Sequence, residues 1–227
     1  MAKRTFLQLC QATARECGVS GNGPASIENQ IGILHSIINW VAAADQEVCT
    51  LYPDWDFLNT SWSHNTIEGV SEAVKPADLG AWDTGSFSIE RDGKLSPLDV
   101  ADYREWRDVL RYGENGNAVP GKVVVNPGGN LTFWPTPNGA YAVSADYWRA
   151  PARMADNSDT SLIPEQFERI IISRAKIYYA EEEGAPAMLM ASQVEYNEIL
   201  NKLQQAMLSW HAVRASTDAS VMQVVVL

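Results

Sequence analysis

The sequence predicts an α+β protein in which N- and C-terminal helices enclose a β-rich insertion. Apolar residues recur at three-and-four spacing within residues 5–58 and 160–214, which indicates helices. Residues 59–159 hold most of the prolines and glycines, and short alternating runs replace the helical stripes there. We therefore expect a discontinuous helical domain formed by residues 1–58 and 160–214, a β-rich insertion at 59–159, and a C-terminal arm at 215–227.

Two helices are expected in the N-terminal part of the chain. The first runs from about Thr5 to Cys17, and Gly18 ends it. The second runs from about Ser26, a suitable N-cap, to Cys49. The second helix is indicated by a long apolar stripe, made of Ile27, Ile31, Leu34, Ile38, Val41, Ala42 and Val48.

The β-rich insertion is expected to contain short strands and one helix. The helix has Ser96 as its cap and Pro97 in its first position, and it closes at Tyr112 and Gly113. The expected strands are Thr66–Val74, Ser86–Arg91, Lys122–Val125, Leu131–Trp134 and Ala140–Trp148.

The last two of these strands, in the segment LTFWPTPNGAYAVSADYW, are predicted to form a hairpin. Pro135 and Pro137 cannot donate to a strand ladder, and Asn138 or Gly139 would supply a positive φ in the turn. Aromatic residues occur on both faces, which favours burial on both sides over an exposed sugar-stacking platform. The candidate interface residues of the insertion are Trp134, Tyr147 and Trp148.

The C-terminal part predicts two further helices, Pro164–Glu182 and Pro186–Arg214, which should pack as an antiparallel pair. The arm then combines a linker-like stretch, ASTDAS, with the strongly β-prone run VMQVVVL. An unpaired apolar strand is an aggregation hazard, so we expect it to be buried, either against a partner chain or as a last strand of its own subunit. The candidate interface residues of the arm are Val221, Met222, Val224, Val225, Val226 and Leu227.

Catalytic and cofactor motifs of the common classes do not occur in the sequence. The glycines of NPGGN, residues 126–130, link two expected strands and indicate a tight turn rather than a phosphate loop. The histidines and cysteines show no metal-ligand spacing. We expect no enzyme, cofactor or metal. The residues that come nearest to an acidic cluster, which a hydrolase would need, are Asp54, Asp56, Asp99, Asp102 and Glu105. Asp99 and Asp102 are better explained as residues of a first helical turn.

Charge and composition restrict the partners. A net charge of -11 makes the chain a poor DNA binder. An acidic channel wall could still surround DNA without binding it, because like charges repel. The three cysteines, Cys10, Cys17 and Cys49, are expected to be reduced thiols of a cytosol-like compartment. No apolar run is long enough for a transmembrane helix, and the first residues do not resemble a secretory signal.

Three stretches together resemble the phage head-to-tail adaptor proteins. They are YPDWDFL at residues 52–58, LTFWPTPNGAYAVSADYWRAP at 131–151, and LIPEQFERIIISRAKIYYAEEEGAP at 162–186, which ASQVEYNEILNKLQQ follows. The third stretch is the most specific of the three. Residues 59–125 resemble the family in little beyond their general pattern of short alternating runs.

The resemblance implies a helical bundle with a β-rich insertion and no catalytic residues. Family members form rings of twelve beneath the portal protein, extend the DNA channel and present a docking surface for tail or nozzle proteins. The resemblance thus implies a virion protein of the head-tail junction, assembled in the host cytoplasm, past which DNA moves without specific binding.

An alternative reading is a carbohydrate-binding or tail-fibre-associated β module. It requires an exposed aromatic platform that includes Trp82, Trp134 or Trp148.

Overall fold

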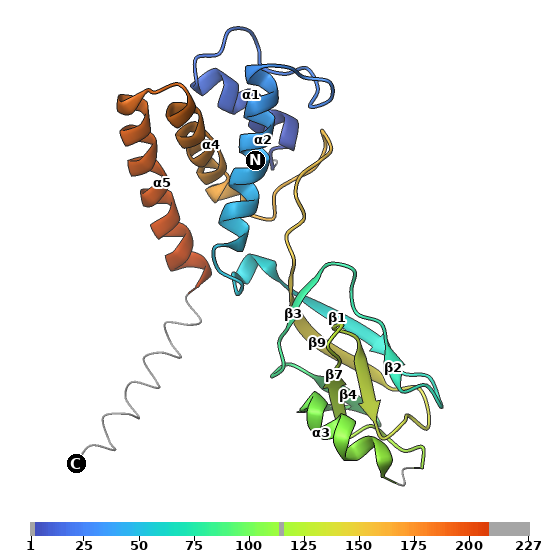
Figure 1. Ribbon diagram of the computed structural model, residues 1–227. Helices are drawn as coiled ribbons and strands as arrows, with labels where there is room; N and C mark the ends of the chain where they lie inside the picture. The colour runs from blue at the N-terminus through green and yellow to red at the C-terminus, as the bar shows by residue number, and fades with distance from the viewer. Residues whose placement is uncertain (1–2, 114–115, 209–227) are drawn as a thin grey trace, which may run out of the picture. The chain divides into compact units, whose positions relative to one another are not determined.

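The chain folds into two compact units in the computed structural model, which describes residues 3–113 and 116–208 (Figure 1). The described residues form five α-helices and two β-sheets, so the α+β class is confirmed. One unit comprises the chain up to Phe57 and from Pro151 onward, and the other is Leu58–Ala150. The first is called the helical unit and the second the β unit.

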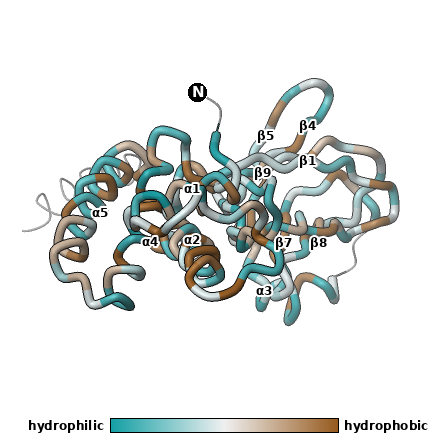
Figure 2. Tube along the Cα trace, turned by 90° about the horizontal axis from the view of Figure 1, so that it is seen from above, coloured by the Kyte–Doolittle hydropathy of each residue, from teal (hydrophilic) through white to brown (hydrophobic). Residues whose placement is uncertain are grey.

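The helical unit contains α1 (Phe6–Glu16), α2 (Ile33–Thr50), α4 (Arg169–Glu182) and α5 (Pro186–Met207). α4 packs against α1, α2 and α5. Figure 2 shows hydrophobic and hydrophilic residues mixed along these helices. α1, α2 and α4 bury apolar residues, whereas Met190 and Val194 of α5 are exposed. The largest fully buried side chains of this unit are Phe6, Leu9, Ile37, Trp55, Ile163, Ile170, Ile171 and Ile172.

α1 begins where the sequence places it, because Thr5 forms a complete capping box. The Thr5 hydroxyl accepts a hydrogen bond from the Gln8 N–H at 3.3 Å, and the Gln8 side chain accepts one from the Thr5 N–H at 2.9 Å. This reciprocal pair satisfies two amides that the first helical turn would otherwise leave unpaired.

The expected start of α2 at Ser26 is wrong, because the helix begins at Ile33 after Gly32, whose φ is +59°. The Asn157 side chain accepts a hydrogen bond from the Ile27 N–H at 2.9 Å and also bonds to the Ser26 hydroxyl. These contacts hold residues 26–27 outside the helix. Ile31, expected in the apolar stripe, is 86% exposed.

The C-terminal helices are close to the sequence prediction. Pro164 precedes a short 3₁₀ turn, Glu165–Phe167, and α4 begins at Arg169. α5 begins at Pro186, as expected, and ends at Met207 within the described residues. The predicted arm and the last turns of the predicted helix lie outside the described residues.

The β unit consists of two sheets. One has the strand order β1-β9-β4-β5, with β3 also paired to β9, and the other has the order β2-β8-β7-β6. α3 (Tyr103–Asp108) and a 3₁₀ turn (Leu110–Tyr112) follow β6, and a further 3₁₀ turn, Asp56–Leu58, precedes β1. The strands are β1 Asn59–Asn65, β2 Glu72–Ala73, β3 Leu79–Trp82, β4 Ser88–Arg91, β5 Lys94–Pro97, β6 Asp99–Ala101, β7 Lys122–Val125, β8 Leu131–Trp134 and β9 Ala142–Arg149.

One hydrophobic core joins the two sheets. Phe87, Ile89 and Val143 come from the first sheet or its immediate flanks, and Val123 and Phe133 come from the second. All of these side chains are at most 3% exposed. The buried apolar side chains of the two sheets therefore pack against one another in a single core.

The predicted hairpin is wrong, because β8 and β9 belong to different sheets. β8 pairs with β2 and β7, whereas β9 pairs with β1, β3 and β4. Neither Asn138 nor Gly139 has a positive φ, and the Trp134–Pro135 peptide bond is cis. The connecting segment is held by other parts of the chain instead, since Thr66 bonds to Gly139 and Tyr141 and residue 118 bonds to residues 136 and 138.

The other sequence predictions in the β unit are mixed. The bounds of β7 and β8 are confirmed, and β4 and β9 lie within two residues of their predicted bounds. Of the expected strand Thr66–Val74 only Glu72–Ala73 forms, and β1, β3, β5 and β6 were not predicted. Ser96 and Pro97 belong to β5 rather than to a helix start. The cap of α3 is Asp102, which accepts hydrogen bonds from the Arg104 and Glu105 amides at 2.8 and 3.1 Å.

Candidate interaction surfaces

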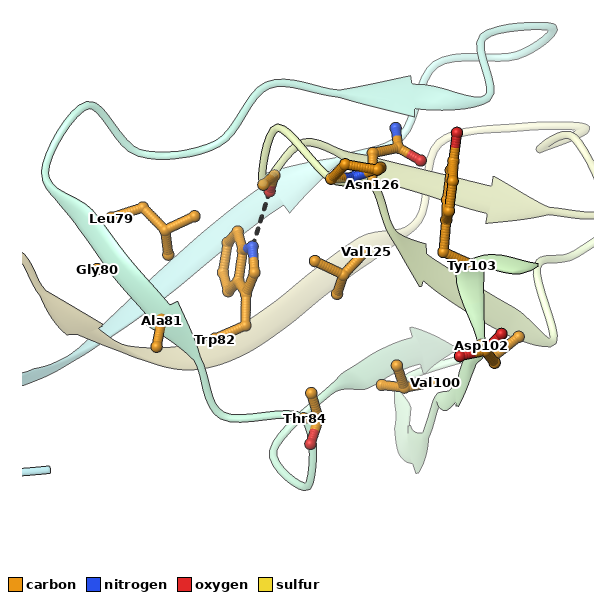
Figure 3. A pocket seen from close by; sticks show the side chains of 13 residues that line it. Leu79, Gly80, Ala81, Trp82, Thr84, Val100, Asp102, Tyr103, Val125 and Asn126 are labelled. Carbon is orange, nitrogen blue, oxygen red and sulfur yellow. Dashed lines mark hydrogen bonds between the residues drawn. The ribbon is translucent and has the colours of Figure 1, made fainter. Parts of the chain in front are cut away.

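An open groove of about 780 Å³ lies in the β unit between the two sheets (Figure 3). β3 forms one side, and β6, the start of α3 and the β7–β8 turn form the other. Its side chains are mainly aliphatic or aromatic, including Leu79, Trp82, Val100, Tyr103 and Val125. This volume lies within the usual range of binding pockets.

Trp82 forms a fixed part of the groove. Its indole N–H donates a hydrogen bond to the Gly129 carbonyl at 2.8 Å (Figure 3). Its ring lies 5.2 Å from that of Trp62, 5.5 Å from that of Phe87 and 5.7 Å from that of Tyr147. With its polar atom bonded and its ring enclosed by aromatic neighbours, Trp82 is only 8% exposed and is preorganised.

The same turn requires glycine at position 129. Gly129 has a φ of +86°, and a Cβ placed there would lie 2.9 Å from Leu79 Cδ2. A side chain would therefore strain the backbone and press on the groove wall. No sequence pattern before or after Gly129 indicated that this turn lines a cavity, because the other wall comes from β3.

The interface candidates predicted in the β unit are not equally accessible. Tyr147 is 7% exposed, and its hydroxyl donates a hydrogen bond to Asp78 at 2.9 Å. Burial and this carboxylate raise the pKa of Tyr147. Trp134 and Trp148 are half-buried and lie in different sheets, so they form no continuous strand face. Trp134 borders a small cavity of about 200 Å³ together with Trp106.

The three tryptophans proposed for a sugar-binding platform, all of them described by the structure, do not form an exposed aromatic face. Trp82 belongs to the core between the sheets, and Trp134 and Trp148 are half-buried. Sugar stacking needs an open aromatic face, so this geometry does not favour the alternative reading.

The acidic residues considered for hydrolysis have other surroundings. Asp102 is the cap of α3, and Asp99 lies in β6. Asp54 and Asp56 belong to the helical unit rather than to the β unit. Among the described residues, no group of three or more His, Cys, Asp or Glu side chains is arranged to hold a metal ion.

A network of ion pairs joins three helices of the helical unit. Arg169 of α4 forms salt bridges with Glu16 of α1 and, at 2.7 Å, with Glu195 of α5. Lys176 reaches the same two carboxylates at 3.2 and 3.3 Å. Because the Lys176 side chain is only 15% exposed, the network is partly shielded from water. Sequence inspection missed it, since Glu16 lies more than a hundred residues from its partners.

The cysteines are buried inside the helical unit and free of disulfides. Burial raises the pKa of Cys10 to about 12 and that of Cys17 to about 11, and it also raises the pKa of Cys49. All three are therefore protonated near neutral pH and poorly nucleophilic.

In the part of the chain that the structure describes, no helix has both the length and the apolar character needed to cross a membrane. The described residues form a two-unit α+β protein, and its β unit carries an open groove with a mainly apolar lining.

The chain belongs to the SU10 adaptor protein family, whose model matches residues 4–221. The match spans both units, and it confirms the resemblance to phage head-to-tail adaptors that the three sequence stretches predicted. A search of curated proteins finds no match to the chain. As a member of this family, the chain is a structural phage protein and a component of the virion.

Proposed function

We propose that the chain forms a ring beneath the portal protein, links the portal vertex to the tail and extends the DNA channel. The observation that carries this proposal is the adaptor-family match over residues 4–221. In the proposed assembly twelve copies surround the channel, in keeping with what the family resemblance implies.

The two units are proposed to have separate tasks in the ring. The helical unit is the bundle that gives each copy a stiff body, supported by the packing of α4 on three helices and by the Arg169–Glu16–Glu195 ion pairs. The β unit is an insertion that meets the tail or a neighbouring copy. Its two-sheet core supports the half-buried interface candidates Trp134 and Trp148.

The charge of the chain suits a channel wall. A net charge of -11 repels the phosphate backbone, so DNA would pass without being held. In this proposal the acidic surface serves transport rather than recognition, and the head-tail junction is the place in the virion where such a wall is needed.

The arm, residues 215–227, is proposed to join each copy to the portal or to a neighbour. It contains the apolar residues Val221, Met222, Val224, Val225, Val226 and Leu227 behind a polar linker. Strand addition to another chain would satisfy their backbone hydrogen bonds and bury their side chains.

Deleting residues 215–227 should leave the fold intact and weaken assembly with the portal, because described residues outside the arm build the buried cores of both units. Circular dichroism would check the fold, and co-sedimentation with purified portal would measure assembly, with an expected loss of at least tenfold in bound chain. A matched control replaces Ser216 and Thr217 by alanine and keeps the apolar run. Unchanged portal binding by the deletion variant would refute the role of the arm.

A further inference from the structure

The groove of the β unit is bordered by the last strand of a sheet as well as by apolar side chains. Among the described strands, β6 is the last of its sheet, and its one strand partner is β7, with which it pairs in parallel. Its residues Val100 and Ala101 line the groove. An edge strand offers backbone N–H and C=O groups that a further strand can pair with, so the groove suits an extended peptide.

The chemistry of the lining selects an uncharged, apolar occupant. Asp102 is the only charged residue among those that line the groove, and its carboxylate already caps α3. Leu79, Trp82 and Val125 supply aliphatic and aromatic surface. A charged peptide would lose its hydration in such a groove without gaining a partner.

The chain itself contains a segment with the matching chemistry. Residues 221–227 read VMQVVVL, with no charged side chain and four valines. In an extended conformation Met222, Val224 and Val226 lie on one face, so three apolar side chains would enter the groove together. Residues 209–220 separate this segment from Leu208, and a chain of twelve residues can reach at most ~40 Å.

We propose that the segment Val221–Leu227 of one copy docks as an added strand in the groove of an adjacent copy, along β6. The chemistry of the groove and of the segment supports docking of the segment in the groove. The proposal that the segment comes from an adjacent copy rests on the proposed ring. Such a head-to-tail contact joins two different surfaces, and contacts of this kind form a ring when the rotation from copy to copy closes. Burying the three apolar side chains over Trp82 and Val100 supplies the affinity, and pairing with β6 fixes the direction.

Peptide binding tests the groove. The probe is a fluorescently labelled peptide of residues 215–227, blocked at both ends, and the receptor is the full chain carrying Val224→Asp and Val226→Asp, which disables its own segment. We expect saturable binding by fluorescence anisotropy. Val100→Asp, inside the groove, should weaken binding at least tenfold, whereas Val109→Asp should not, because Val109 is 63% exposed and does not line the groove.

Thr84→Arg is a second variant that blocks the groove, and it serves if Val100→Asp disturbs folding. Thr84 is exposed at the groove, so arginine there blocks entry without entering the core. Circular dichroism identical to the parent confirms the fold. A tenfold loss with Thr84→Arg supports the proposal, and equal binding by the blocked and open grooves, or no saturable binding at all, overturns it.

Two complementary variants test whether the segment comes from a neighbour. One full chain carries Thr84→Arg, with a blocked groove and an intact segment, and the other carries Val224→Asp and Val226→Asp, with an open groove. Each alone should sediment as a single chain, and their mixture should yield particles with the mass of two chains. Peptide binding without this pairing would overturn the adjacent-copy assignment. Portal co-sedimentation is a separate readout, so a failure of the proposed ring under the portal is distinguishable from a failure of the groove.

Discussion

Asp45 is the clearest case of a single residue held in an unfavourable ionisation state. It lies on α2, is 3% exposed, and accepts a hydrogen bond from the Ser161 hydroxyl. Burial raises its pKa from 3.8 to about 6, and the nearby Lys3 and the Ser161 hydroxyl only partly offset this effect. Cys49 is close enough for Asp45 to raise the pKa of its thiol. The ionised form therefore costs folding free energy at neutral pH.

Replacing Asp45 by asparagine should remove a pH dependence of stability. Between pH 4 and pH 6 the folded state binds the Asp45 proton more tightly than the unfolded state, so the stability due to this group falls as pH rises through that window. The shift corresponds to about 3 kcal/mol at most. Urea unfolding should therefore show the free energy of unfolding of Asp45→Asn rising relative to the parent from pH 4 to pH 7. A constant difference would contradict the burial argument.

At the scale of elements, the packing of two sheets on one core holds the β unit together. Phe133 of β8 is 2% exposed and belongs to the core cluster that also includes Ile89 of β4 and Val143 of β9. Its ring also stacks on His64 of β1, at 6.1 Å between centroids. Removing this ring would leave a cavity between the sheets rather than at a surface.

Phe133→Ala should destabilise the β unit by about 3–5 kcal/mol, because a large buried ring is lost. Val109→Ala is the matched control, since Val109 is 63% exposed, and it should change stability by less than ~0.5 kcal/mol. Urea unfolding followed by tryptophan fluorescence measures both. A Phe133→Ala cost below ~1 kcal/mol would show that the two sheets do not share a tightly packed core.

The sequence predicted element types better than strand partners. Lys122–Val125 and Leu131–Trp134 were predicted with the correct bounds because apolar runs there are bounded by proline and glycine turns. Alternation correctly indicated one buried face of β9, whereas Leu131, Thr132 and Phe133 of β8 are all buried. A period of two says which residues share a face and not which strand lies beside them. β8 and β9 bury the same core from opposite sheets, which local patterns cannot distinguish from a hairpin.

Features built from distant segments were not predictable from local sequence. β1, NTSWSHN, was missed because its polar residues alternate with only two large side chains, Trp62 and His64. The groove was missed because its walls come from residues spread between Leu79 and Gly129 in two sheets. The predicted arm residues lie outside the described residues, so their role stays a prediction.

At the scale of the whole molecule, the family and the chemistry are consistent with an assembly protein. The SU10 adaptor model matches residues 4–221 and thus includes both units. The acidic net charge suits the proposed channel wall, and the groove offers the proposed docking site for a neighbouring copy. The central claim is therefore assembly with a portal.

Electron microscopy of the purified chain mixed with its portal protein tests that claim most directly. We expect a continuous ring of added density on one end of the portal, coaxial with its channel and containing twelve copies, with an open lumen wide enough for duplex DNA. Free 25.0 kDa chains beside bare portals, or single copies attached at scattered sites, would contradict it.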